Sequence, residues 1–189
     1  MKLIGSLTPE RLTTDPSEDM SPAFSPGRSI RFFRVSKGRA TFIVIPAIGG
    51  PEHLVAEVPA PDPYIPRPLF AWFPDGKRVV TDGLALLSTQ SDETRTLTSP
   101  PTKSTPDISP AVSPDGRTVA FSRSTSYLSD IYLLDLTEDL KPKGEPRRLT
   151  FLKHLNSLSP AWTPYGREII FSSGSFRKRD EPLEGPGFR

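Results

Sequence analysis

The stretch Pro110-Ala-Val-Ser-Pro-Asp-Gly116, with the apolar run Arg117-Thr-Val-Ala-Phe-Ser122 after it, decides how this chain folds. Its second Pro presets φ at about −65° for the first corner of a type I turn, and Asp suits the second corner. Gly supplies the left-handed position that follows. A turn of this kind joins two adjacent antiparallel strands. The stretch therefore predicts a β-hairpin.

The same phrase recurs along the chain. Its other copies are Pro22-Ala-Phe-Ser-Pro-Gly27, Phe70-Ala-Trp-Phe-Pro-Asp-Gly76 and Pro160-Ala-Trp-Thr-Pro-Tyr-Gly166. The turn prolines Pro26, Pro74, Pro114 and Pro164 are separated by 48, 40 and 50 residues. Intervals of about 40–50 residues are typical of the four-stranded blades of a β-propeller. Every copy keeps its glycine, whereas the Asp is present only as Asp75 and Asp115.

A second pattern is in phase with the first. The segments that precede the phrases are Glu10-Arg-Leu-Thr13, Glu52-His-Leu-Val55, Arg95-Thr-Leu-Thr98 and Arg147-Arg-Leu-Thr150. Alternating runs such as Thr41-Phe-Ile-Val-Ile45 lie between them, so each full repeat offers four short strands. The residue two positions before the turn Pro is expected to pack between neighbouring blades; these residues are Phe24, Trp72, Val112 and Trp162.

These motifs resemble the TolB-type, WD-like β-propeller repeat of bacteria, which reads roughly Arg-Leu-Thr, a spacer, Pro-Ala-Trp-Ser-Pro-Asp-Gly, then Ile-Ala-Phe and Ile-Tyr. The resemblance covers residues 9–172. It implies an all-β fold, a propeller of four-stranded antiparallel blades. Similar repeats occur in the TolB translocation protein, in prolyl-oligopeptidase-like peptidases and in C-terminal propellers of bacterial signalling proteins. The turn and packing positions that it implies are Gly27, Asp75, Gly76, Asp115, Gly116, Gly166, Phe24, Trp72 and Trp162.

The ring of blades is incomplete by count. A Leu-Thr strand near residues 10–14 is expected to open the chain, three repeats follow, and the fourth stops after Glu168-Ile-Ile-Phe-Ser172. This amounts to about three and a half blades, whereas a six-bladed ring needs about 275 residues. We expect a part of a larger propeller, or a half-ring that pairs through its open blade edges. Residues 173–189, rich in Pro, Gly and charge, are expected to form a disordered tail.

Composition restricts the classes of function. The 189 residues include 23 Pro and 13 Gly, and no Cys is available for disulfides or thiolate chemistry. The net charge of +2 is made of interspersed charges rather than a basic stripe, which argues against nucleic-acid binding. The first residues contain no apolar run long enough for a signal peptide or a membrane span. As written, the chain is expected in the cytoplasm, or in the periplasm if it belongs to a longer exported protein.

Motifs for catalysis are not found in the sequence. It has no Gly-x-Ser-x-Gly elbow, no metal spacing of its two histidines, His53 and His154, and no phosphate loop, so no cofactor is expected. Asp75 and Asp115 are interpreted as turn residues rather than as a ring of catalytic or metal-binding carboxylates. Trp72 and Trp162 are interpreted as packing between blades rather than as a ligand platform.

Three functional hypotheses follow from the sequence. The leading one is a non-enzymatic scaffold or sensor segment whose loops bind a protein or peptide. The alternative is the accessory propeller of a prolyl-oligopeptidase-like peptidase whose hydrolase domain is absent here. The third is a lactonase-like enzyme with a metal in its central funnel, for which the sequence supplies no clear set of ligands.

Overall fold

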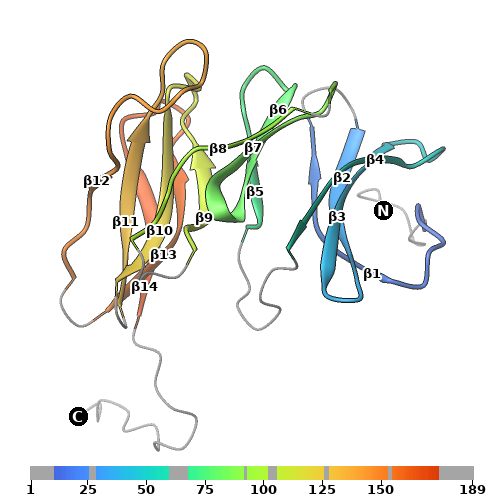
Figure 1. The fold of residues 1–189 in the computed structure, drawn as a ribbon, viewed down its shortest axis with the longest axis horizontal. Coiled ribbons are helices and arrows are strands. Elements are labelled where there is room, and N and C mark those ends of the chain that lie inside the picture. Colours follow the sequence, from blue (N-terminus) through green and yellow to red (C-terminus); the bar gives the residue numbers. More distant parts are fainter. Residues whose placement is uncertain are drawn as a thin grey trace, which may run out of the picture.

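Sheets of antiparallel strands form the framework of the described chain (Figure 1). The computed structural model describes residues 11–25, 29–59, 68–91, 93–101, 106–125, 128–152 and 155–174. These residues form three four-stranded sheets and one two-stranded sheet. The prediction of an all-β, incomplete propeller of four-stranded antiparallel blades is confirmed.

Each sheet is one blade, and its strands follow one another in sequence. Blade I contains β1 (Glu18–Phe24), β2 (Ser29–Ser36), β3 (Arg39–Pro46) and β4 (His53–Pro59). Blade II contains β5 (Phe70–Trp72), β6 (Arg78–Thr81), β7 (Ala85–Ser88) and β8 (Thr94–Thr96). Blade III contains β9 (Ile108–Val112), β10 (Thr118–Thr125), β11 (Leu128–Asp135) and β12 (Arg147–Arg148). Blade IV contains β13 (Asn156–Trp162) and β14 (Ile169–Gly174).

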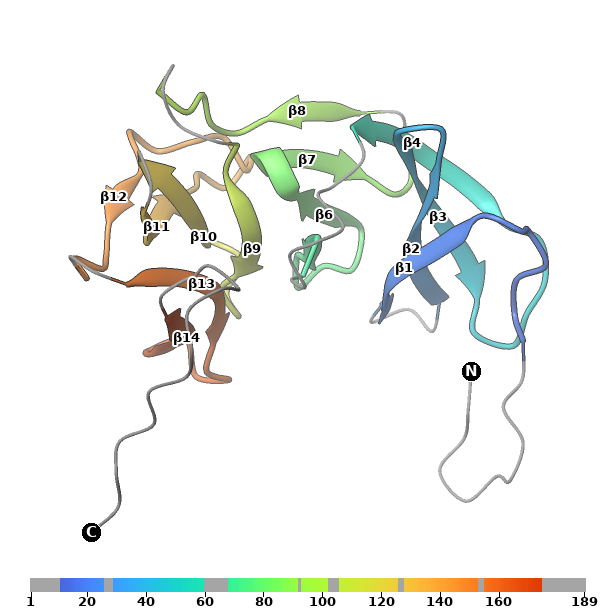
Figure 2. The same ribbon diagram turned by 90° about the horizontal axis from the view of Figure 1, so that it is seen from below.

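The blades stand side by side along an open arc, with β4, β8 and β12 on its outer side (Figure 2). Each blade buries its apolar side chains against its neighbours. Phe33 and Phe42 of blade I pack with Phe70 of blade II, and Val80 of blade II packs with Phe121 of blade III. Because these clusters span two sheets, a blade is stabilised by its neighbours rather than by a core of its own.

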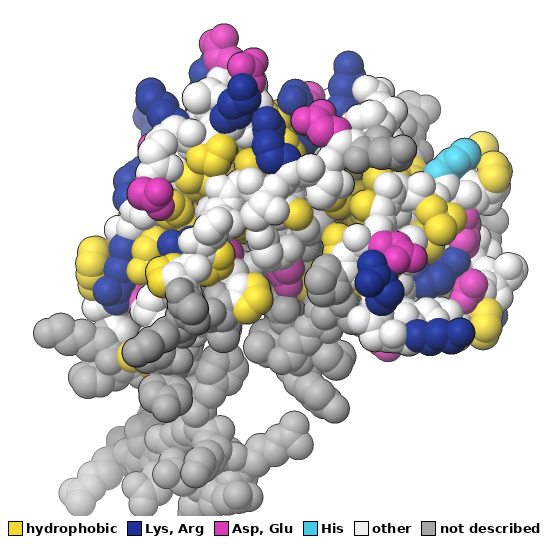
Figure 3. Space-filling view, in the orientation of Figure 1, with side chains coloured by type: hydrophobic (Ala, Val, Ile, Leu, Met, Phe, Trp, Pro, Cys, Tyr) yellow, Lys and Arg dark blue, Asp and Glu magenta, His cyan; other side chains and the backbone are white. Residues whose placement is uncertain are grey.

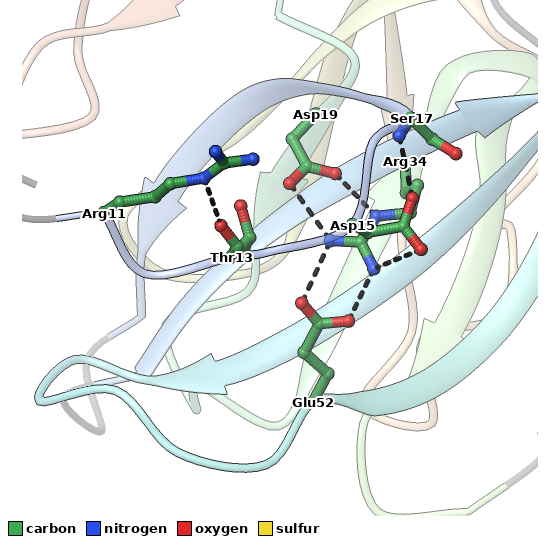
Figure 4. A network of polar contacts seen from close by, with 7 residues as sticks. All are labelled: Arg11, Thr13, Asp15, Ser17, Asp19, Arg34 and Glu52. Atoms are coloured by element: carbon green, nitrogen blue, oxygen red, sulfur yellow. Dashed lines mark hydrogen bonds and ion pairs between the residues drawn. The ribbon is translucent and has the colours of Figure 1, made fainter.

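A buried ion pair recurs at one position of blades I and III. In blade III, Arg123 on β10 donates from Nε and Nη2 to Asp107, at 2.7 and 2.8 Å, and Thr98 of blade II donates to the same carboxylate. In blade I, Arg34 donates to Asp19 from the same two nitrogens. Arg34 also contacts Glu52 and Asp15, as Figure 4 shows. These pairs raise the pKa of both arginines.

A β-bulge recurs on the first strand of blades I, III and IV. Ser21, Ser109 and Ser159 each precede a Pro and have φ of 51°, 54° and 52°. The register of the first strand against the second shifts at each of these sites. The shift lets the strand bend while the following Ala stays paired. In blade II, Leu69-Phe70 replaces Ser-Pro, and the register is regular.

One local expectation is corrected. Residues 11–14 form no strand, because they have no partner strand to pair with; instead Leu12 packs on the Ile30 cluster and Asp15 reaches Arg34. The link between β6 and β7 is a three-residue 3-10 turn, Asp82–Leu84. Leu84 joins Gly83 at positive φ there, and its side chain is fully buried.

The Arg123–Asp107 pair gives the first testable prediction. Asp107 is fully buried, so we expect Arg123→Ser to destabilise the fold by about 3–5 kcal/mol through an uncompensated charge. The double variant Arg123→Ser/Asp107→Ser should recover much of this loss, because blade IV already holds Ser173 opposite Ser157 at these positions. Urea unfolding of the three proteins measures the difference. A double variant less stable than the single one would contradict the prediction.

Candidate functional site

The Pro-x-Gly phrases form identical turns in blades II, III and IV. The amide of the turn Gly donates to the carbonyl three residues earlier, at 3.0 Å for Gly76, 2.8 Å for Gly116 and 2.9 Å for Gly166. All three glycines have positive φ, between 65° and 71°. In the first copy Ser25 donates to the Ser29 carbonyl and closes a turn that is one residue shorter. Its Gly27 lies outside the described residues.

The turn aspartates bond to their own turns. Asp75 accepts from the amides of Lys77 and Arg78 and from the Arg78 guanidinium. Burial raises the pKa of Asp75, but these bonds outweigh it and hold that pKa below its ordinary value. The Ser113 hydroxyl, followed by the Arg117 amide, lowers the pKa of Asp115. Tyr165, which stands in the Asp position of blade IV, is 88% exposed.

The turn glycines also make room for the preceding blade. A Cβ added to Gly116 would lie 3.2 Å from Cδ of Pro74, and one added to Gly166 would lie 3.3 Å from Cδ of Pro114. The turns of blades III and IV therefore pack their glycines on the proline ring of the turn before them. The phrase joins strands within a blade and sets the spacing between blades.

A cleft of about 250 Å³ lies between the turns of blades II and III. Phe73 and Leu140 form its apolar part, and Arg78, Arg117 and Glu138 bring charges. Its volume is below the roughly 300–1,000 Å³ of typical small-molecule sites. Basic and acidic side chains alternate along the upper edge of the molecule in Figure 3. The mixture of basic and acidic side chains at this edge is typical of a solvent-exposed surface rather than of a ligand pocket.

Two positions meet at every blade interface. The first position is the residue that lies two before the turn Pro of one blade. The second position is the residue that lies four after the turn Gly of the blade before it. Trp72 meets Arg31, Val112 packs in the cluster of Val80, and Trp162 packs in the cluster of Ala120. The indole nitrogen of Trp162 also donates to the Ala111 carbonyl of blade III, at 3.1 Å.

At the two ends of the arc these positions face no described blade. Phe24, at the first position of blade I, is 62% exposed, and Ile170, at the second position of blade IV, is 68% exposed. Phe24, which the sequence predicts to pack between blades, meets no neighbouring blade among the described residues. We call the sheet surface of blade I that carries Phe24, and that of blade IV that carries Ile170, the end faces.

Arg31 is a polar feature of the interfaces that the sequence did not reveal. It is 8% exposed, and its guanidinium stacks 3.9 Å from the ring centre of Trp72. Its Nε and Nη1 and the indole nitrogen of Trp72 have no hydrogen-bond partner among the described residues. Burial lowers the pKa of Arg31 to about 10. No sequence motif marks it, because an Arg within a strand normally indicates a solvent-facing position.

His53 takes no part in the blade interfaces. His53 is exposed at the start of β4, and His154 lies outside the described residues. In the part of the chain that the structure describes, no three His, Asp or Glu side chains gather as metal ligands would. The described residues also contain no helix long and apolar enough to cross a membrane.

The arrangement of blades defines a β-propeller segment, and comparison with known proteins relates it to TolB. The crystal structure of TolB from Acinetobacter baumannii matches with a TM-score of 0.66 at 16% identity, over 87% of this chain and 40% of TolB. The fold is therefore that of a TolB-type propeller segment. No family model matches the chain. No curated protein matches it.

Two other structures are less similar. A puromycin hydrolase matches with a TM-score of 0.46 at 17% identity, over 83% of this chain and 36% of the hydrolase. A protein from Lactobacillus plantarum matches with a TM-score of 0.44 at 12% identity, over 84% of this chain and 55% of that protein. The chain thus spans 36–55% of the length of these three structures.

The glycine contacts give the second prediction. Gly144 has φ of 86° with nothing near its missing Cβ, whereas Gly116 has φ of 71° and faces Pro74. Gly144→Ala should cost about 1–2 kcal/mol through backbone strain alone, and Gly116→Ala should cost more. Asp115→Ala should cost less than Gly116→Ala, about 0.5–1.5 kcal/mol, because it removes only local hydrogen bonds.

Urea unfolding ranks these variants. Equal losses for the two glycine variants would contradict the contact between turns of neighbouring blades. A larger loss for Asp115→Ala than for Gly116→Ala would contradict the importance of the left-handed glycine.

Proposed function

We propose that this chain is a non-catalytic scaffold segment of a larger TolB-like propeller protein, which binds other protein chains through its end faces. The observation that carries the proposal is the pair of exposed apolar residues Phe24 and Ile170. They occupy the two positions that meet at each internal blade interface, one at each end of the arc. Exposed apolar side chains at positions of this kind mark protein-interaction sites.

The interface between blades III and IV supports this proposal, because it can be compared with the end face of blade IV. There Trp162 packs in the cluster of Ala120 and Ile169, and its indole bonds to the Ala111 carbonyl. On the outer side of blade IV, Ala161 and Ile170 occupy the equivalents of Ala111 and Ala120, and both are exposed. This surface suits an aromatic side chain placed as Phe24 is in blade I.

The partner that fits is therefore another blade of this repeat. It is supplied either by further blades of a longer chain or by a second copy of this one. In either case the same apolar side chains become buried and the same strand edges become paired. This removes the free-energy cost of leaving those side chains and backbone groups exposed to water. A binding role of this kind needs no catalytic group, in agreement with the use of Asp75 and Asp115 within their own turns.

Association through the end faces is the third prediction. We expect the 189-residue chain to form dimers or larger species in light scattering, increasing with protein concentration. Phe24→Ser/Ile170→Ser should lower the association constant at least tenfold, an effect of about 1.4 kcal/mol, within what two buried apolar side chains contribute. Circular dichroism should stay unchanged, since both residues are exposed.

The matched control is Ile48→Ser, in the β3–β4 connection. Ile48 is 91% exposed, but it does not lie on an end face. A cooperative monomer at all concentrations, or equal effects of the control and the double variant, would contradict the proposal.

A further inference from the structure

Three hydrogen-bond donors that have no acceptor among the described residues lie together between blades I and II. They are Nε and Nη1 of Arg31 on β2 and the indole nitrogen of Trp72 on β5. The Arg31 side chain stacks on the Trp72 ring and is 8% exposed as a residue. Buried polar groups are paired in the great majority of cases, so a group of three orphaned donors needs an explanation.

The fold does not require this arrangement. At the interface between blades III and IV, Ala120 occupies the position of Arg31, and the indole of Trp162 bonds to the Ala111 carbonyl. At the interface between blades II and III, the two positions are the apolar pair Val80 and Val112. A propeller interface of this type is therefore stable without a cation, and Arg31 is specific to the first interface.

Nearby arginines show how this chain neutralises a buried guanidinium. Arg34, three residues along β2, contacts Asp15, Asp19 and Glu52, and Arg123 binds Asp107 through two bonds. No described carboxylate contacts Arg31 in this way. Among the described residues, Arg31 thus has no counter-ion, whereas the other two buried arginines, Arg34 and Arg123, each have one.

The chemistry of the donors determines what can satisfy them. Arg and Trp side chains donate hydrogen bonds and accept none. A water molecule would bring two further hydrogens that need acceptors, whereas an oxyanion brings acceptors only and neutralises the charge. A guanidinium can bind a carboxylate either through Nε and Nη2 or through Nη1 and Nη2. Each of these pairs includes one of the two Arg31 nitrogens named above, so a planar carboxylate can bind Arg31 through two parallel hydrogen bonds.

We propose that Arg31 and Trp72 form a binding site for a single carboxylate group, between blades I and II. The surrounding side chains include Phe33, Phe70 and Val79, which are apolar and favour a monoanion over a doubly charged phosphate. Trp72 is half-buried and lies two residues before the exposed Pro74. The site thus takes an acidic side chain or a chain-terminal carboxylate of a bound peptide, or a small free carboxylate.

Thermal unfolding at constant ionic strength tests the site. Sodium acetate should raise the Tm of the native chain relative to sodium chloride, by about 2–4 °C at roughly five times its Kd. A blocked Gly-Glu-Gly tripeptide amide should act as acetate does, and its Gly-Gln-Gly counterpart should not. The tripeptide distinguishes a peptide carboxylate from a small free one, since a site that excludes peptides responds to acetate alone. Inorganic phosphate should have less effect than acetate.

Variants connect the response to Arg31. Arg31→Met should keep the fold, as apolar residues do at the other interfaces, and should lose the response to acetate. Arg31→Lys should retain a weaker response, because an ammonium lacks the fork. Arg39→Met removes an exposed arginine that pairs with Glu57 and should leave the response intact.

The outcomes separate the alternatives. An acetate effect of equal size in Arg31→Met, or no effect of any carboxylate on the native chain, would overturn the proposal. A response to phosphate alone would overturn the assignment to carboxylates. Association through the end faces is measured separately, because Arg31 lies at an internal interface.

Discussion

The contact between neighbouring blades is the constraint on which the rest of this structure depends. A four-stranded sheet of this length has two apolar faces and cannot bury either one by itself. The clusters around Phe33, Phe121 and Ile131 are each completed by side chains of the next blade. The turn phrase serves this contact directly, because Gly116 and Gly166 allow the proline ring of the preceding turn to approach. The repeated phrase therefore forms the turn within a blade and also sets the distance between neighbouring sheets.

Local chemistry explains which parts of the fold could be predicted from the sequence. The turn at Pro114-Asp-Gly116 depends on residues that lie next to each other, so its position and its four strands per repeat were predictable, down to the short β12 at Arg147–Arg148. The exposure of Phe24 and the missing strand at residues 11–14 depend on a neighbouring blade, which no local pattern reports. The Ser-Pro bulges were missed although Ser21, Ser109 and Ser159 repeat in phase, because Ser at positive φ is uncommon before Pro.

The interfaces differ in their polar contacts, and this difference has a consequence for folding. Blade III joins blade II through Asp107, Arg123 and Thr98, and Asp82 accepts from the Ser109 amide at the same interface. Blades I and II meet at Arg31 and Trp72, and blade IV carries serines in place of the ion pair. Repeat proteins with identical interfaces can pair in the wrong order. Buried polar groups that match only one neighbour penalise such mispairing, since an unmatched charge would remain unpaired.

The two end faces are different surfaces, so contact between them is head-to-tail rather than isologous. Phe24 lies on the face that would meet a preceding blade, and Ile170 on the face that would meet a following one. A contact built on these positions repeats the geometry of the internal interfaces, where each blade is turned relative to the last along the arc of Figure 2. If that rotation is repeated from blade to blade, the arc keeps its curvature. A head-to-tail contact forms a ring, rather than an open filament, when its rotation closes. The curvature that the blade interfaces already have therefore favours completion of a propeller, whether the added blades come from a longer chain or from a second copy.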